Sequence, residues 1–164
     1  MASPSSSTYT ACVGIDWADR KHDFCLQASD APKREFGTIE HNPQAIDQWV
    51  QSLHHRFGGP IAICLELAKG PLVAALQRYD YVVLFPVHPA TLATYRQAFV
   101  PSRAKDDPTD AAIALDILLR HPEKLHPIQL QSVDMRTLAT LVEARRGLAA
   151  DIVRVTNRLT TTLK

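Results

Sequence analysis

Three short segments of apolar and alternating residues begin the folded part of the chain. Residues 11–17 form a continuous apolar run typical of a buried strand, whereas residues 22–29 and 33–40 alternate between apolar and polar positions. Short polar turns separate the three segments. The pattern therefore predicts an antiparallel meander of three strands.

From residue 43 onward the pattern changes to helices that alternate with fully apolar strands. A helix is expected over residues 43–57, because Asn42 suits its N-cap and Gly58 suits its end. Residues 61–66 and 81–87 are continuous apolar runs, as expected of central strands covered on both faces. Further helices are expected over residues 72–79, over residues 88–99 and from Asp107 onward.

The order of these elements indicates an α/β fold. Three hairpin strands followed by strand–helix units imply a mixed sheet with helices on both faces. This is the order of the ribonuclease-H-like fold, in which the first strand lies beside the fourth. The residues that end those two strands are then expected at one edge of the sheet, where open α/β folds bind their ligands.

Residues 133–164 predict one long amphipathic helix. Its apolar positions recur every three or four residues and are Leu138, Leu141, Leu148, Ile152, Val155 and Leu159. This spacing suits a coiled-coil seam, or a helix docked on a partner. Because the pattern continues to Lys164 without a glycine or proline stop, we expect the chain to be part of a longer protein.

These patterns predict three segments, namely a disordered Ser-rich leader over residues 1–10, a globular domain over 11–131 and the basic helix over 132–164. Hydrophobic residues make up 46% of the 164, which is enough for the core of one such domain. The net charge is only +1. Residues 1–129 carry 12 basic and 14 acidic side chains, whereas residues 130–164 carry 6 and 3, so the basic excess lies in the tail.

Cysteine usage and hydropathy predict a cytoplasmic protein without a membrane partner. Cys12, Cys25 and Cys64 fall in strand-like apolar runs without a CxxC pair, which favours buried reduced thiols over a metal or redox site. No apolar run reaches transmembrane length. The N-terminus lacks the charged start and apolar middle of a secretory signal.

Four acidic residues carry the strongest indication of chemistry. Asp16 and Glu66 end the first and fourth predicted strands, and Asp107 and Asp110 share one face at the start of a helix. Burying carboxylates together is costly unless a cation pairs with them, and Mg²⁺ is the usual partner of an all-oxygen ligand set. Two such ions can hold a phosphodiester and activate its attacking group.

Each acid also has a structural explanation. Asp107 and Asp110 can cap a helix and interact with its dipole, and Asp16 can be a turn residue. Glu66 is harder to explain this way, since only Lys69 offers it a nearby cation. Taken together, in this order and on these elements, the four acids favour a metal site.

Three sequence blocks resemble a known family. VGIDWADRKHD, CLELAKGPL and AKDDPTDAAIA are similar to the signature blocks of the DEDD transposases of bacterial insertion sequences, which are relatives of the Piv invertases. The RNA-guided members of this family are called bridge-RNA recombinases. The resemblance covers about residues 11–164.

The resemblance implies a RuvC-like domain whose four carboxylates bind Mg²⁺, a role that Mn²⁺ can take over. The matching residues, as both catalytic groups and metal ligands, are Asp16, Glu66, Asp107 and Asp110. Asp106 stands where the family usually has Thr or Ser, and the three-residue spacing to Asp110 favours Asp107 over Asp106 as the ligand. The resemblance also implies a coiled-coil segment and then a domain that supplies a nucleophilic serine. That domain is absent from this chain, so we expect the chain alone to fail at complete recombination.

Several basic residues are candidates for nucleic-acid contacts. Lys69, Arg103 and Lys105 fall near the predicted carboxylate edge and are either phosphate-binding or ordinary solvated charges. On the long helix, Arg145, Arg146, Arg154 and Arg158 suit either a phosphate backbone or a solvated coiled-coil flank. Trp17, beside Asp16, can stack on a base or pack against a helix.

The leading interpretation is the N-terminal catalytic portion of an insertion-sequence transposase. It would cleave and exchange DNA strands with Mg²⁺, with a guide RNA in the intact protein, and pair with a second copy through the long helix. We expect it in the bacterial cytoplasm, associated with the nucleoid. One alternative is a Holliday-junction-resolvase-like nuclease. Another is a non-catalytic nucleic-acid-binding dimerisation module, whose binding to RNA or DNA would not depend on magnesium. A sugar-kinase-like ATPase is disfavoured, because no glycine-rich phosphate loop follows Asp16.

Overall fold

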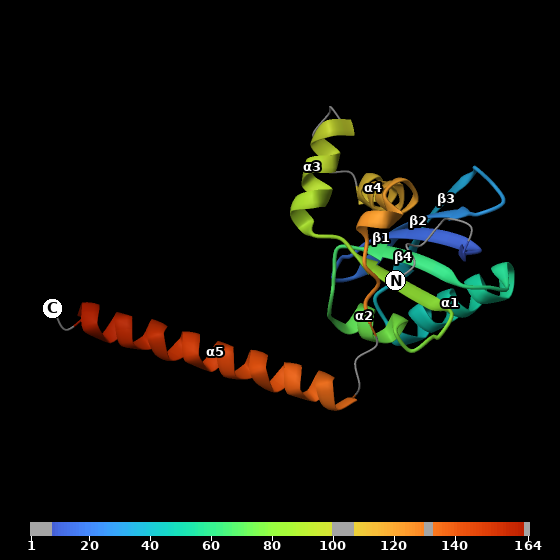
Figure 1. Ribbon diagram of the computed structural model, residues 1–164. Coiled ribbons are helices and arrows are strands. Elements are labelled where there is room, and N and C mark those ends of the chain that lie inside the picture. Colours follow the sequence, from blue (N-terminus) through green and yellow to red (C-terminus); the bar gives the residue numbers. More distant parts are fainter. Residues whose placement is uncertain (1–7, 100–106, 130–132, 163–164) are drawn as a thin grey trace. The chain divides into compact units, whose positions relative to one another are not determined.

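The computed structural model describes residues 8–99, 107–129 and 133–162, and it divides into two compact units, Met1–Ile128 and Gln129–Lys164 (Figure 1). Two parts of the predicted leader belong to the first unit. The Thr10 amide donates to the Pro60 carbonyl at 2.8 Å, and the Tyr9 ring packs edge-on against Phe85. The rest of the predicted leader, residues 1–7, lies outside the described residues.

A five-stranded mixed sheet forms the centre of the first unit. Its strands are β1 (Ala11–Asp16), β2 (Lys21–Ala28), β3 (Arg34–Glu40), β4 (Ile61–Leu65) and β5 (Val82–Pro86). Their order in the sheet is β3-β2-β1-β4-β5. The first three strands are antiparallel, and β4 and β5 continue the sheet parallel to β1. The first strand therefore lies beside the fourth, as the sequence predicts, and the mixed α/β architecture fits a ribonuclease-H-like domain.

Four helices accompany these strands in the part of the first unit that the structure describes. They are α1 (Pro43–Phe57), α2 (Pro71–Leu76), α3 (Pro89–Phe99) and α4 (Asp107–Arg120), and a short 3₁₀ turn, η2 (Pro122–Lys124), follows α4. The predicted ends of α1 are confirmed, because Asn42 Oδ1 accepts the Ala45 amide at 2.8 Å and Gly58 has φ 63°. Helix α2 is shorter than the expected 72–79, because the bonds from the Arg78 and Tyr79 amides reach back only three residues and tighten the chain into a turn.

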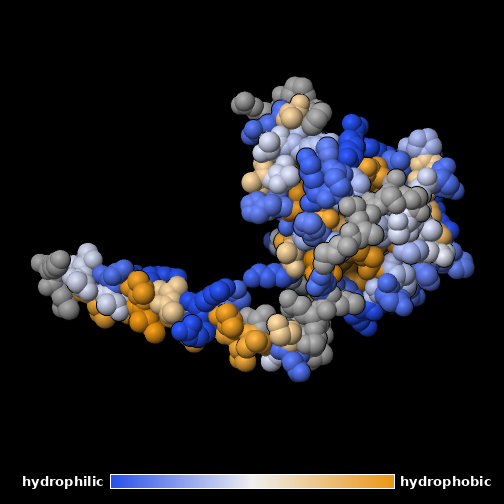
Figure 2. Space-filling model, viewed as in Figure 1, coloured by the Kyte–Doolittle hydropathy of each residue, from blue (hydrophilic) through white to orange (hydrophobic). Residues whose placement is uncertain are grey.

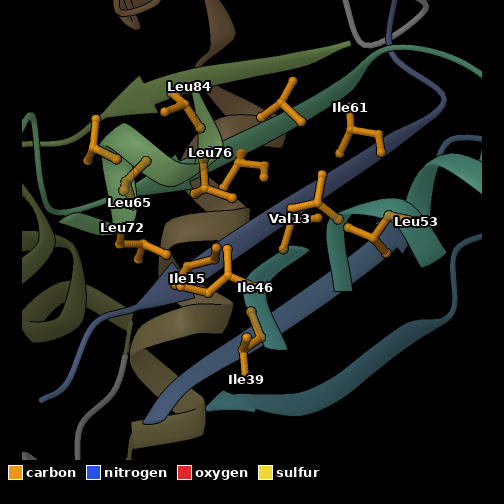
Figure 3. Close-up of a cluster of buried hydrophobic side chains, with 14 of the residues drawn as sticks. Val13, Ile15, Ile39, Ile46, Leu53, Ile61, Leu65, Leu72, Leu76 and Leu84 are labelled. Carbon is orange, nitrogen blue, oxygen red and sulfur yellow. The ribbon is translucent and has the colours of Figure 1, made fainter. Parts of the chain in front are cut away.

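Each face of the sheet is covered by one pair of helices and has its own apolar core. On one face, side chains of β1, β2, β4 and β5 pack with α1 and α2. Figure 3 shows this cluster, with Val13 and Ile15 of β1 in the same core as Leu53 of α1 and Leu76 of α2. On the other face, the alternate positions of the same strands pack with α3 and α4. The three cysteines are buried, as predicted, and they lie in this second core.

Helix α4 touches the backbone of β1 at Gly14. A Cβ atom placed on Gly14 would lie 2.5 Å from the Leu115 amide nitrogen and closer still to the Ala111 carbonyl oxygen. Both of these are backbone atoms of α4, so no side-chain rotation can relieve such a clash. Small strand residues next to Gly14 allow the same approach, since Cys25 and Cys64 are its partners in the neighbouring strands. Helix α4 is therefore fixed against β1 two residues before Asp16.

The second unit consists of helix α5 (Val133–Thr162). Its apolar residues are exposed, and Figure 2 shows hydrophobic patches along the helix. They include Leu138, Leu141, Leu148, Ile152, Val155 and Leu159. The long helix predicted from residue 133 is confirmed, whereas its pairing in a coiled coil stays a prediction. None of the helices in the described ranges combines the length and apolar character needed to cross a membrane.

We predict that Gly14→Ala destabilises the first unit by about 3 kcal/mol, at the upper end of overpacking costs, because the clash involves backbone atoms. Urea unfolding followed by far-UV circular dichroism measures this loss. Gly147→Ala is the control, since nothing lies within 4 Å of a Cβ at that exposed helical position. Equal unfolding midpoints for Gly14→Ala and the wild-type chain would contradict the prediction.

Candidate metal centre

The carboxyl ends of β1 and β4 place two of the predicted acids at the same edge of the sheet. Ile15 and Leu65 are partners in the parallel β1–β4 pair, so Asp16 and Glu66 are the next residues on neighbouring strands. Asp16 is partly buried, whereas Glu66 is exposed and follows β4 instead of ending it. The predicted strand 61–66 ends one residue too late, because the chain bends directly after Leu65.

The other two predicted acids belong to the first turn of α4. Side chains alternate along β1, and Cys12 faces the core beneath α3 and α4, so Asp16 is on the α4 face as well. Asp110 is buried, with 8% of its surface exposed, beside Ala111 at the contact with Gly14. Helix α4 begins at Asp107, as predicted, but the side chain of Asp107 lies outside the described residues.

The described side chains do not form a closed metal cage. Among them, no group of three or more His, Cys, Asp or Glu residues is close enough together to hold a metal ion. Asp106, Arg103 and Lys105, which the sequence also singles out, lie outside the described residues. The fold therefore brings the strand ends and the start of α4 to one edge, and the ligand set itself stays a prediction.

Asp110 is held by an arginine that sequence reasoning missed. Arg96 of α3 donates from Nε to Asp110 Oδ1 at 2.7 Å, and its Nη2 contacts the same oxygen. Both recorded contacts end on Oδ1, which leaves Oδ2 on the other side of the carboxylate. Arg96 is the basic residue in the last turn of α3, and only the packing of α3 against α4 reveals its partner.

A fifth acid at the same edge also escaped the sequence analysis. Asp23 of β2 is the register partner of Asp16 in the antiparallel β1–β2 pair, and 9% of its surface is exposed. Partners in an antiparallel pair project from the same face of the sheet, so Asp23 also faces α4. The alternation of residues 22–29 does not show that Asp23 lies opposite Asp16, because this depends on the register of the hairpin.

The turn that leaves Asp16 is held from the opposite face by a histidine pair. The Ala18 amide donates to His22 Nδ1 at 3.3 Å, which places the proton of this ring on Nε2. His22 Nε2 then donates to His41 Nδ1 at 2.9 Å. The Trp17 ring stacks on His22, with centroids 6.5 Å apart. Burial, and next the neighbouring His41, lowers the pKa of His22 from its ordinary value to about 4.

Comparison with known proteins identifies the family of this chain. A family model of IS110-type DEDD transposases, described as "Transposase", matches residues 13–164. The chain belongs to this DEDD transposase family. It is also 27% identical over 158 residues to a Streptomyces coelicolor protein named "Mini-circle putative transposase for IS117". That alignment covers 94% of this chain and 38% of the relative, so the chain spans less than half the length of that relative.

Membership of the DEDD transposase family agrees with the acidic edge of the sheet. Transposases act on DNA, and this family generally uses divalent metal ions. Carboxylates from rigid strands and from a helix start form the kind of donor set that such ions prefer. The particular ion and the residues that bind it are treated below as proposals.

We predict that His22 makes the folded state less stable in mild acid. In the unfolded chain His22 regains an ordinary pKa near 6.5. Between pH 6.5 and about 4 its ring is therefore protonated in the unfolded state and neutral in the folded state. The stabilisation is complete above this window and is lost as the pH falls through it, with a slope of up to about 1.4 kcal/mol per pH unit. Urea unfolding at a series of pH values measures the slope.

The matched comparison is between His22→Gln and His126→Gln, since His126 is exposed. The first substitution should flatten the pH dependence of stability and the second should leave it unchanged. If His22→Gln retains the wild-type slope, the buried pair does not cause it.

We also predict that Arg96→Gln lowers the free energy of unfolding by about 1–3 kcal/mol, because it leaves the buried Asp110 carboxylate without its cation. Arg120→Gln is the control on the same helix as Asp110. Its 3.7 Å contact to Asp116 is largely exposed and should contribute no more than about 0.5 kcal/mol. Urea unfolding at neutral pH, without added divalent metal, checks both values. Equal losses would show that the Arg96–Asp110 pair is no stronger than a surface contact.

Proposed function

We propose that this chain is the N-terminal, metal-dependent catalytic part of a DNA transposase. The single observation that carries the proposal is the edge of the sheet at which β1, β4 and the start of α4 meet. In a chain of the DEDD transposase family, the signature acids Asp16, Glu66 and Asp110 all belong to this edge.

The residues proposed to hold the metal are Asp16, Glu66, Asp107 and Asp110, with Mg²⁺ as the ion and Mn²⁺ as a functional substitute. They fit such an ion because all of their donors are carboxylate oxygens, and because Asp110 is buried and Asp16 partly buried. When bound, the metal supplies charge neutralisation and activation of the group that attacks the phosphodiester. The chain itself contributes rigid strand ends that fix the positions of the acids and a helix that excludes water from one side.

The contacts with nucleic acid are proposed on the two units separately. In the first unit Lys69 belongs to the loop after β4, beside Glu66, and we propose Arg103 and Lys105 as further phosphate contacts. On α5 the proposed phosphate contacts are Arg145, Arg146, Arg154 and Arg158. Arg146 and Arg154 pair with acids three residues away on their own helix, in exposed pairs that cost little to break. A guide RNA in the intact protein is part of the same proposal.

The exposed apolar stripe of α5 supports a homo-oligomer in which two copies pair through this helix. On this proposal the 164-residue chain binds metal and nucleic acid by itself, and complete strand exchange needs the serine-bearing domain that the family resemblance implies. The catalytic part then provides the metal-dependent step in a larger assembly.

The proposal is tested by titrating the 164-residue chain with Mg²⁺ and Mn²⁺ while its thermal unfolding is followed. At a metal concentration about 100 times the dissociation constant, binding should stabilise the wild-type chain by about 2.7 kcal/mol. The double variant Asp16→Asn, Glu66→Gln should lose this stabilisation. Asp30→Asn, Asp80→Asn is the matched control, because it removes two exposed acids from the opposite edge of the sheet. If Mg²⁺ and Mn²⁺ stabilise both double variants equally, the proposed metal site is wrong, and the proposed function fails with it.

A further inference from the structure

We propose that Trp17 stacks on an unpaired base of the DNA strand whose phosphodiester lies at the acidic edge of the sheet. The inference rests on the proposed function, because it adds a base-binding residue to the same site. It is carried by the exposure of Trp17, by the contacts that hold its ring and by its position directly after Asp16.

Trp17 presents a large aromatic side chain to solvent, with 37% of its surface exposed. The other tryptophan of the chain, Trp49, packs against Phe24 and the core beneath α1 and α2. Tryptophan carries a large apolar surface, and folded proteins normally cover most of it. An exposed tryptophan beside a group of signature acids is therefore a candidate for contact with the substrate.

The Trp17 ring is exposed and yet held in place. It stacks on His22, with the ring centroids 6.5 Å apart and an angle of 26° between the planes. His22 is fully buried, and its two ring nitrogens contact the Ala18 amide and His41. The His41 amide also donates to the Arg20 carbonyl at 2.9 Å, which fixes the turn that carries the ring. A ring already held in one orientation loses little conformational freedom when a ligand binds, as suits a binding surface.

The position of Trp17 places its ring next to the acids without adding to them. Trp17 directly follows Asp16 at the carboxyl end of β1. Asp16 belongs to the face of the sheet that α4 covers, whereas Trp17 stacks on a histidine of the opposite face. The base and the phosphate of a nucleotide extend from different positions of its sugar. A strand with a phosphate at the acids therefore brings an adjoining base toward the indole ring.

The surroundings of Trp17 favour a nucleobase over an apolar protein partner. In the described part of the first unit, the exposed large hydrophobic residues are Trp17 and Phe36, and the others belong to α5. The turn after Trp17 exposes the charged residues Asp19, Arg20 and Lys21. A protein interface is built around a contiguous apolar patch. A single aromatic ring with cations nearby matches instead the base and the phosphates of a single strand.

The test is the binding of a fluorescein-labelled oligothymidylate, about ten nucleotides long, to the 164-residue chain with Mg²⁺ at low ionic strength. Fluorescence anisotropy measures the affinity. Trp17→Leu keeps an apolar cover on His22 and removes the aromatic ring, whereas Trp17→Phe keeps a smaller ring. Phe36→Leu is the matched control, because it removes another exposed aromatic ring, on the edge strand β3. An abasic oligonucleotide of the same length supplies the phosphates without the bases.

We expect Trp17→Leu to weaken oligothymidylate binding by about fivefold to a hundredfold, which corresponds to the loss of one stacked base. Trp17→Phe should lose less affinity, and Phe36→Leu should bind like wild type. The abasic oligonucleotide should bind wild type and Trp17→Leu equally, because its contacts are electrostatic. A Trp17 that only covers His22 would give the opposite pattern, with a lower thermal midpoint for Trp17→Leu and unchanged affinity.

A second measurement observes the ring itself. Trp49→Phe leaves Trp17 as the single tryptophan of the chain. This substitution removes a buried Nε1 that has no hydrogen-bond partner among the described residues, so no hydrogen bond is lost there. We expect oligothymidylate to quench the remaining emission and the abasic oligonucleotide to leave it unchanged. Equal quenching by both would show that the ring responds to phosphate binding without stacking, and would overturn the inference.

The outcomes separate the inference from the function on which it rests. If Trp17→Leu binds oligothymidylate within about twofold of wild type, or if wild type does not bind it, Trp17 is not a stacking residue. The metal titration of the Asp16→Asn, Glu66→Gln variant then decides the proposed function independently. Tighter binding and stronger quenching by an oligouridylate of equal length would assign the ring to RNA and overturn its assignment to DNA. If that double variant keeps its metal response, the proposed function fails, and the placement of the base beside a cleaved phosphodiester fails with it.

Discussion

A helix can lie against the backbone of a strand only where the strand carries no side chain, and in this sheet residue 14 provides that gap. The Ala111 carbonyl and the Leu115 amide of α4 occupy the space that any other side chain would need. Asp16 follows Gly14 by two residues on β1, and Asp110 precedes Ala111 by one on α4. One backbone contact therefore fixes the distance between two acids that are 94 positions apart in the sequence.

The two faces of the sheet differ in the size of their side chains and in the charges they carry. The face covered by α1 and α2 is filled mainly by branched aliphatic side chains, and Trp49, which packs against them, keeps a buried Nε1 without a hydrogen-bond partner among the described residues. The face covered by α3 and α4 uses smaller residues, with Cys, Ala and Gly at its centre, and its charges gather around α4. Helix α4 can approach closely because these residues are small, and its acids reach the sheet edge because the helix is so close.

Local signals made most of the fold predictable. The hairpin turns, the Asn42 cap, the Gly58 stop and the continuous apolar run of β4 each have a short-range cause, and together they gave the order of elements along the chain. The position of β1 beside β4 followed from the ribonuclease-H-like fold that has this order. The ends of α2 and β4 were less predictable, because they depend on where hydrogen bonding gives way to a turn.

The candidate site was predictable only in part, for a related reason. Asp16, Glu66 and Asp110 could be found from their places at the ends of elements, whereas the partners of His22, Asp23 and Arg96 depend on tertiary contacts. Strand register decides that Asp23 faces Asp16, and helix packing decides that Arg96 reaches Asp110. Neither can be seen in a linear pattern, because the residues involved have no unusual neighbours in sequence. A side chain whose role is set by a distant element stays hidden until the fold is known.

The apolar cores on both faces also bear on what a metal would do here. In small metal-dependent domains the ion replaces a missing core, so that binding and folding are the same event. This domain has two apolar cores and a helix fixed by backbone contact, and Arg96 already neutralises one of its buried acids. Its framework is therefore built before any ion binds. On the proposed function, the free energy of metal binding would therefore not be needed for folding and would be available to position the acids at the sheet edge and the bound phosphodiester.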